Sequence, residues 1–408
     1  EGALLDAADP RGHAHAHVAA QALRSGSERR VGLELEFHLI DLVTPLRRPT
    51  WAAIQSLVDR LPPMPSGSSV TLEPGGQIEL STPVSPDVSS AVAALREDRS
   101  ALRAELAERR YGAVPLGADP ARPVRRINPG ARYVAMERHF AAMGCELAGR
   151  SMMSSTAALQ VNLDAGPASG WTERLALVRS LVPLLVALSS TSPWLGGRTS
   201  GWHSMRQETW HGIDHGRSDP IRAGEPTSAW ADYALAAPVM LLRGGGLSPV
   251  TDRLSFADWL REPARIGRPA TLDDLDYHLT TLFPPVRPRG YLEIRCIDSL
   301  PDRWWPALAA IVVTLVDHPL AAEGAADACA PVATAWESAA RTGLADPPLR
   351  RAAATCLDLA ALHCPPDLKA EVEEFVELVA AGRTPGDDRR AQVERSGALH
   401  VLEEEARA

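Results

Sequence analysis

Lysine is almost absent from this 408-residue sequence: Lys369 is the only one, and arginine supplies the rest of the 42 basic side chains. A phosphate-binding loop of the G-x-x-x-x-G-K-[ST] type requires a lysine, and no segment has this pattern, which excludes a P-loop. Any bound phosphate would therefore be held by arginine, by backbone N–H groups or through a metal ion.

Cysteine is also scarce, and no two cysteines form a C-x-x-C pair. An odd number of scattered cysteines predicts free thiols in a reducing cytosol rather than a disulfide framework. The first residues contain no charged segment followed by an apolar run, so we expect no signal peptide and a cytoplasmic protein. The five cysteines are Cys145, Cys296, Cys329, Cys356 and Cys364.

Long apolar runs are missing as well. The most apolar stretches, Leu175–Leu188 and Ala307–Val316, are too short or too interrupted to cross a bilayer, so we expect no membrane partner. A net charge of −9 and a pI near 5.8 argue against the basic surface that nucleic-acid binding requires. ATP is not excluded, because a few arginines and a metal ion can hold it.

The residues that are present predict interspersed strands and helices. We expect strands at 31–40, 70–82, 154–164 and 291–298, the second as a pair around Pro74-Gly75-Gly76. The regular βαβ alternation is missing, which favours an α+β fold. We expect one catalytic domain over residues 1–408, with its motifs in 30–298 and a helical C-terminal part in 302–408. Other helices are expected at 12–24, 49–61, 87–110, 131–143, 172–189 and 230–242.

The segment VGLELEFHLI, residues 31–40, alternates strictly between apolar and polar side chains. This pattern predicts a strand with one face on the core. The other face carries Glu34, Glu36 and His38. Because alternate residues point the same way, the strand aims two like charges into one space.

Three further strands share this feature. EPGGQIELST places Glu79 opposite an apolar face and carries Glu73 before its turn, AALQVNLD carries Gln160 and Asn162, and YLEIRCID carries Glu293 and Arg295. An ordinary half-exposed antiparallel sheet also alternates, and this is the simpler explanation for any single strand. Glutamate, however, is depleted in strands, and like charges on neighbouring strands destabilise a sheet.

The recurrence of carboxylates and amides on these strands points to bound cations. Oxygen ligands, without cysteine and with few histidines, suit Mg²⁺ or Mn²⁺ rather than Zn²⁺. Carboxylate-bound Mg²⁺ in proteins usually bridges to phosphates, so the acidic face is a candidate nucleoside-triphosphate site. Arg295 could offset the charge of a transferring phosphoryl group.

Taken in order, these segments resemble the glutamate–cysteine ligases. The resemblance rests on GLELEF, EPGGQIELST, SSTAALQVNLD, GWHSMRQETWHGIDH and YLEIRCID, which span about residues 32–298. It implies a curved, mainly antiparallel sheet of the glutamine-synthetase type with helices packed on its outer face. The details resemble the actinobacterial form of the family, whose role is the first step of ergothioneine biosynthesis.

The resemblance also implies roles for the acidic face. Gln160 and Asn162 would lie near the metal ions and ATP, together with Arg295. Glu36 and Arg295 would be the catalytic residues. The Mg²⁺ ligands would be Glu34, Glu36, Glu73, Glu79 and Glu293.

The substrate pocket implied by the resemblance lies in the segment GWHSMRQETW. Arg206, together with Arg198, would face the α-carboxylate of glutamate, and Trp210 would form a wall. No motif marks the cysteine site. The segment Gly196–Gly216 is the candidate lid over a water-sensitive acyl phosphate.

The implied reaction joins L-glutamate to L-cysteine with ATP, through γ-glutamyl phosphate, and releases ADP and phosphate. Because the amine site is unmarked, another ATP-dependent carboxylate–amine ligase on the same fold remains an alternative. A catalytically silent nucleotide-binding homologue is the second alternative. We expect a monomer or a homodimer.

Several other residues allow a functional and a plainer interpretation. His203, His211 and His215 suggest a metal cluster, but loop contacts explain them more simply, as a leader helix explains the alternating His13, His15 and His17. His38 is a candidate base or a partner of a carboxylate. Gly244–Gly246 could cradle phosphate, but we expect it to end a helix.

Overall fold

The computed structural model describes residues 3–408 and is built on a seven-stranded sheet in which every strand pair is antiparallel. The strand order is β2-β3-β1-β5-β9-β8, and β4 pairs with the second half of β1. This confirms the expected α+β class. The strands are β1 (Val31–Asp41), β2 (Ser69–Leu72), β3 (Ile78–Ser81), β4 (Tyr111–Val114), β5 (Ala158–Leu163), β8 (Val286–Pro288) and β9 (Leu292–Asp298).

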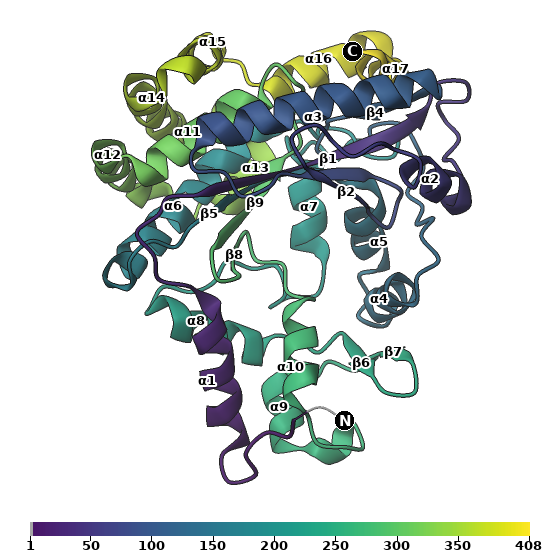
Figure 1. Cartoon of the computed structure of the whole chain (residues 1–408), viewed down its shortest axis with the longest axis vertical. Helices are drawn as coiled ribbons and strands as arrows, with labels where there is room; N and C mark the ends of the chain where they lie inside the picture. The colour runs from purple at the N-terminus through teal and green to yellow at the C-terminus, as the bar shows by residue number, and fades with distance from the viewer. Residues whose placement is uncertain (1–2) are drawn as a thin grey trace.

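One face of the sheet is apolar and lies against the main hydrophobic core. Val31, Leu33, Leu35 and Phe37 alternate along β1 and are at most 1% exposed. In Figure 1 the helices α3 (Val88–Glu108) and α11 (Trp305–Asp317) cross above the sheet, and α6 (Trp171–Ser189) packs on β9. Burial of this face fixes the register, because a slip by one residue would turn the glutamates of β1 into the core.

The opposite face looks toward α4 (Ala131–Ala142), α5 (Glu146–Ser155) and α7 (Met205–Gly212), which lie below the sheet in Figure 1. A second group of elements lies further below these helices. It contains α1 (Pro10–Ala22), α8 (Pro226–Ala236), α9 (Phe256–Arg261), α10 (Leu272–Leu279) and the hairpin β6 (Leu241–Arg243) with β7 (Leu247–Pro249).

The C-terminal part is helical, as expected, and it packs back onto the sheet. Helix α11 contacts β5 and α3, and α17 contacts β4. Trp304 and Trp305 are 5% and 1% exposed and so belong to the core. The helices are α12 (Pro319–Cys329), α13 (Trp336–Thr342), α14 (Pro347–His363), α15 (Lys369–Ala380), α16 (Pro385–Ser396) and α17 (Ala398–Arg407).

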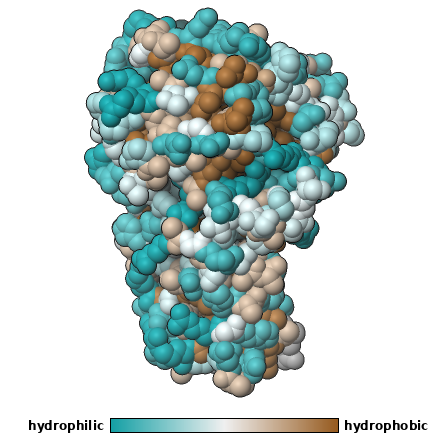
Figure 2. All heavy atoms as spheres, turned by 90° about the vertical axis from the view of Figure 1, so that its left-hand side faces the viewer, coloured by the Kyte–Doolittle hydropathy of each residue, from teal (hydrophilic) through white to brown (hydrophobic). Residues whose placement is uncertain are grey.

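Figure 2 views the left-hand side of Figure 1 and shows apolar residues gathered mainly in its upper half. Leu320 of α12 and Leu362 of α14 are 61% and 69% exposed, and both helices lie in the upper half of Figure 1. Within residues 3–408, no single helix has the length and apolar character needed to cross a membrane. Helix α11 and residues 319–332 meet those criteria only as a pair bent by 95°. The remaining helix is α2 (Trp51–Val58), and short 3-10 turns occur at Ala168–Gly170, Pro263–Arg265, Ala330–Val332, Gly343–Ala345 and Pro366–Leu368.

Two expected elements are wrong in their details. The helix expected over 230–242 ends at Ala236, because Pro238 forces Ala237 into an extended conformation. Gly244–Gly246 does not end a helix but turns the β6–β7 hairpin, and all three glycines have positive φ.

The strand expected over 154–164 begins only at Ala158, and α5 precedes it. Serine usually weakens a helix because its hydroxyl competes for backbone groups. Here the Ser154 hydroxyl bonds the carbonyl of Arg150, and the Thr156 hydroxyl bonds that of Met152 at 2.6 Å. These bonds follow the helical spacing, so the polar run remains helical up to Ser155.

Candidate active site

The register of the sheet lines up polar side chains in three rows across the face opposite the core. In the first row, Glu36 of β1 stands directly opposite Glu79 of β3. In the second, Glu34 stands between a serine and a glutamine. The rows are Thr71–Glu79–Glu36, Ser81–Glu34–Gln160 and Gly32–Asn162–Glu293–Arg287.

Glu73 joins these rows from the turn after β2. The turn is closed by bonds from the Glu73 N–H to the Gln77 carbonyl and from the Gly76 N–H to the Glu73 carbonyl, both 2.9 Å. Gln77 is buried, and its amide donates to the Thr156 carbonyl at 2.8 Å. The turn is therefore fixed against the segment after α5, and Glu73 is held at the acidic face.

The carboxylates of this face resist ionisation together. Burial, together with Glu79, raises the pKa of Glu34 to about 7, and the same two causes raise the pKa of Glu73 to about 7. Burial, with Glu73 and Glu79, raises the pKa of Glu36 well above its usual value. Such mutually repelling acids are typical of a site that binds cations or protons.

The hydrogen bonds around these carboxylates leave one acceptor unused. Glu34 receives bonds from the Asn162 amide at 2.8 Å and the Gln160 amide at 3.0 Å, and Glu36 receives one from the Ala158 N–H at 2.7 Å. Asn162 Oδ1 is buried and has no hydrogen-bond partner. A cation would satisfy this oxygen and the repelling carboxylates, so the donor set fits Mg²⁺.

Glu293 differs from the other four glutamates because arginines surround it. Its carboxylate lies 2.6 Å from Arg287 Nε, 3.2 Å from Arg295 Nη1 and 3.3 Å from Arg289 Nη1. Although its burial acts in the opposite direction, Arg295 and Arg287 lower its pKa to about 2. Glu293 is therefore ionised and paired in this structure, whereas Glu34, Glu36 and Glu73 repel one another.

Arg295 follows Glu293 by two residues and so lies on the same face, next to a bulge in β9. Leu159 and Val161 of β5 pair with Ile297 and Ile294, so β9 has one extra residue in this interval. Bulges commonly re-aim side chains beside active sites. Arg295 Nη1 donates to Gln160 Oε1 at 2.8 Å, so the guanidinium lies beside the amide that also holds Glu34.

A cavity of about 190 Å³ is open between the acidic face and the helices below it. Its charged lining comes from Glu36, Glu73, Arg132, Arg206 and Arg295. Its apolar wall includes three of the seven methionines in the chain. The thioether of methionine is flexible and polarizable, so it adapts to the shape of a neighbouring group. These methionines are Met136, Met152 and Met153.

A family model described as glutamate-cysteine ligase family 2 (GCS2) matches residues 30–405. This chain belongs to the GCS2 family. It is 49% identical over 398 residues to the protein named glutamate–cysteine ligase EgtA of Mycolicibacterium smegmatis, which covers 97% of this chain and 94% of that protein. The identity to EgtA of Mycobacterium tuberculosis is also 49%, over 91% of this chain and 88% of that protein.

A solved structure, the glutamate–cysteine ligase of Francisella tularensis in complex with AMP, shares the fold of this GCS2 chain. The TM-score is 0.54 at 15% sequence identity, and the match covers 94% of this chain and 88% of that chain.

Two of the three substrate-pocket residues expected in this GCS2 protein line the cavity. Arg206 is 3% exposed, its Nη2 donates to the Arg295 carbonyl at 2.8 Å, and its Nη1 has no hydrogen-bond partner. Trp210 packs on Phe283, with the ring centroids 5.4 Å apart. Arg198 is exposed and is not part of the cavity lining, so the structure does not bring it to the pocket.

The candidate lid Gly196–Gly216 divides into two parts. Residues 197–201 are exposed, whereas Met205, Arg206 and Gln207 at the start of α7 are buried. The Gln207 side chain donates to the Cys296 carbonyl at 2.8 Å and accepts from Trp336 Nε1 at 3.0 Å. The second half is therefore a fixed support, and a moving lid would be confined to the exposed residues.

The histidines take the plainer roles. His38 is fully buried, and its Nε2 lies 3.0 Å from the Leu116 carbonyl, so its hydrogen-bond partner is a backbone group. Burial lowers the pKa of His38 to about 4. His211 lies between Trp202 and Trp336, and His203 abuts Gly343. No three histidine, cysteine, aspartate or glutamate side chains within residues 3–408 stand close enough to form a metal cluster as they are.

Sequence reasoning missed Arg287, Arg289 and the methionine wall. Arg287 lies on β8. This strand has three residues, one of them a proline, and is too short to show an alternating pattern. The methionines lie on α4 and α5, where an apolar stripe is indistinguishable from core in the sequence. The only weak signal was on α4, where Arg132 and Tyr133 precede Met136 by about one helical turn. This spacing puts a charged side chain next to apolar ones on the same face of the helix, and all three residues line the cavity.

Proposed function

We propose that this protein is an ATP-dependent glutamate–cysteine ligase, which forms γ-glutamylcysteine from L-glutamate and L-cysteine and releases ADP and phosphate. The observation that carries the proposal is that mutually repelling glutamates from β1, β3 and the turn after β2 share one face of the sheet, beside a cavity that Glu36, Glu73, Arg206 and Arg295 line. The GCS2 membership and the 49% identity to proteins named EgtA support it. By this likeness the product enters ergothioneine biosynthesis.

The acidic face would hold the triphosphate through Mg²⁺, with Mn²⁺ as a substitute. Glu34, Glu36, Glu73, Glu79 and Glu293 would be the ligands, and bound Mg²⁺ would offset the charge of the phosphates. Asn162 and Gln160 keep the Glu34 carboxylate in place. In this structure no three of these glutamate carboxylates are close enough together to share one metal ion. Cation binding would therefore draw them together.

The chemistry would proceed in two displacements. The γ-carboxylate of glutamate attacks the γ-phosphorus of ATP and gives γ-glutamyl phosphate, and the amine of cysteine then displaces phosphate. Phosphoryl transfer depends on alignment and charge neutralisation rather than on covalent catalysis by the protein. Arg295, held by Gln160 and Glu293, would stabilise charge on the transferring group.

The cavity would select the two amino acids. Arg206 has a free Nη1 and would bind the α-carboxylate of glutamate, with Trp210 as a wall. The side chain of cysteine would lie against the methionines, because polarizable sulfur suits a thiol. Arg198, which lies outside the cavity, takes no part in this proposal.

The whole chain would act as one catalytic unit in the cytoplasm. The C-terminal helices are integral to the sheet layer, since α11 contacts β5 and α17 contacts β4. Trp336 of α13 bonds Gln207, the residue that follows Arg206. Residues beyond 302 would therefore support the pocket although they contain none of the proposed ligands.

The deciding experiment measures phosphate release from ATP with glutamate and each amino acid in turn. Release that requires Mg²⁺ and rises most with cysteine supports the proposal, and mass spectrometry should detect γ-glutamylcysteine. If another amine outperforms cysteine, the protein is a different carboxylate–amine ligase. If Mg·ATP binds calorimetrically but no amine gives turnover, the protein is a silent homologue.

A further inference from the structure

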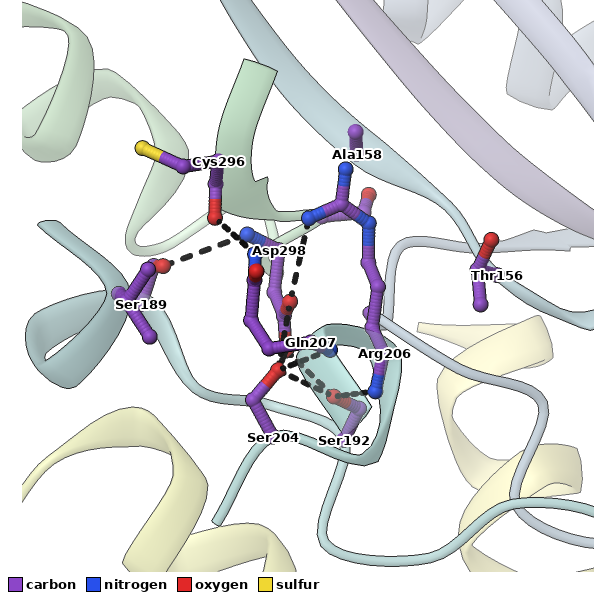
Figure 3. A network of polar contacts seen from close by, with 12 residues as sticks. Thr156, Ala158, Ser189, Ser192, Ser204, Arg206, Gln207, Cys296 and Asp298 are labelled. Carbon is purple, nitrogen blue, oxygen red and sulfur yellow. Dashed lines mark hydrogen bonds and ion pairs between the residues drawn. The ribbon is translucent and has the colours of Figure 1, made fainter. Parts of the chain in front are cut away.

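Beneath the cavity, at the end of β9, lies a buried carboxylate to which no role has been given above. Asp298 is 1% exposed and accepts hydrogen bonds from the Ser192 hydroxyl at 2.6 Å, the Thr191 N–H at 3.1 Å and the Ser204 hydroxyl at 3.1 Å. Figure 3 shows Ser192 and Ser204 beside Asp298. A charge in such a place is costly unless a cation balances it.

Arg206 provides the balancing charge. Its Nη1 lies 3.6 Å from Asp298 Oδ1, and its backbone N–H donates at 3.2 Å to the same Ser192 hydroxyl that bonds Asp298. A separation of 3.6 Å is an ion pair but not a hydrogen bond. The N–H groups of Nη1 therefore remain available for another acceptor, while Asp298 attracts the guanidinium from below.

A purely structural role for Asp298 explains less of the geometry. The first turn of α7 needs a cap, but Ser204 supplies it, since its hydroxyl accepts from the Gln207 N–H at 3.1 Å. The hydroxyl and N–H donors around Asp298 account for its place in the fold but not for its position beside a guanidinium. What a neutral residue could not supply is a negative charge beside Arg206.

We propose that Asp298 is a positioning residue that orients the Arg206 guanidinium toward the carboxylate of the amino-acid substrate and so sets the affinity for that substrate. The Arg295 carbonyl accepts a hydrogen bond from Arg206 Nη2, and Asp298 forms an ion pair with Arg206 Nη1. These two contacts fix the orientation of the guanidinium plane. Pre-orientation lowers the cost of immobilising a long side chain on binding. The inference rests on the proposed function, because it takes glutamate as the substrate that Arg206 binds.

The test is Asp298→Asn, which preserves the shape and one acceptor oxygen, replaces the other oxygen by an amide NH₂ group and removes the charge. With phosphate release as the assay, we expect KM for glutamate to rise about tenfold or more, with kcat and KM for ATP within about twofold of wild type. Ser180→Ala is the control. It removes a buried hydroxyl of α6 that bonds the Leu177 carbonyl and lies outside the Asp298 network, so it should leave KM for glutamate unchanged.

Gly117→Ala provides a second variant if Asp298→Asn does not fold. A Cβ at Gly117 would lie 2.3 Å from Asp298 Oδ2 and would displace the carboxylate without removing its charge. The same selective rise in KM for glutamate is expected. The proposal is overturned if either folded variant has an unchanged KM for glutamate, or a parallel loss for both substrates, or if neither variant folds. Absence of glutamate-dependent turnover in the wild-type enzyme would instead refute the proposed function.

Discussion

Glu36 of β1 and Glu79 of β3 face each other as a direct cross-strand pair. Most antiparallel sheets avoid such a pair because opposed like charges destabilise it. Here burial raises the pKa of Glu36, and Glu73 and Glu79 raise it further. The fold therefore holds an unfavourable contact at the place where the proposed function needs a cation.

Removing one charge of this pair should stabilise the metal-free protein. We expect Glu36→Gln to raise the free energy of unfolding by about 1 kcal/mol and to reduce kcat by about 100-fold or more. Urea unfolding without Mg²⁺ and phosphate release with Mg²⁺ measure the two effects. The exposed Glu108→Gln is the control and should change neither. A destabilised Glu36→Gln variant that retains activity would contradict the assignment.

Stability of the metal-free protein should fall as the pH rises from 6.5 to 8. Glu34 and Glu73 have pKa values near 7 in the folded state and ordinary values when unfolded. Their protonated forms favour folding at low pH, and this contribution is lost as the pH passes 7. Buried His38 and His278, with pKa values lowered to about 4 and about 3, act in the opposite direction, but below pH 6.5.

Thermal unfolding at pH 6.5 and 8, with and without MgCl₂, measures this effect. Since metal ions compete with protons for carboxylates, Mg²⁺ should stabilise the protein more at pH 8. In Glu34→Gln, the midpoint of thermal unfolding should depend less on pH and less on MgCl₂ than in the wild-type protein. A wild-type midpoint that rises between these pH values without metal would refute the acidic cluster.

Arg295 and Arg289 contact the same carboxylate but differ in exposure, which allows a matched comparison. Arg295→Gln should lower kcat by about 100-fold, because its guanidinium lies at the cavity and offsets charge there. Arg289 is 54% exposed, and Arg289→Gln should reduce kcat only a few-fold. Steady-state kinetics at saturating Mg·ATP measure both. Equal losses would place the catalytic charge elsewhere.

The turn that carries Glu73 should tolerate no side chain at Gly75. A Cβ there would lie 2.1 Å from the Ser154 carbonyl oxygen, so Gly75→Ala must displace the turn. We expect a loss of about 1–3 kcal/mol in stability together with strongly reduced turnover. Gly26→Ala meets no atom within 4 Å and serves as the control. Wild-type activity in Gly75→Ala would show that the position of Glu73 is unimportant.

The sequence predicted the strands of the acidic face well, because strict alternation decides which side chains lie on each face of the sheet. VGLELEFHLI and YLEIRCID appear as β1 and β9 with their glutamates on the expected face. It could not predict that Glu293 would be surrounded by Arg287 and Arg289, since that contact depends on an edge strand of three residues. The outlying position of Arg198 was equally hidden, because nothing in a loop sequence specifies its path.

The three central strands, β1, β5 and β9, come from residues 31–41, 158–163 and 292–298. During synthesis, a ribosome must release almost three-quarters of the chain before Arg295 can approach Glu34. Contacts so distant along the chain form slowly. The nascent chain therefore cannot assemble this acidic face early, and a premature stop before β9 would leave the first carboxylates without their counter-charge.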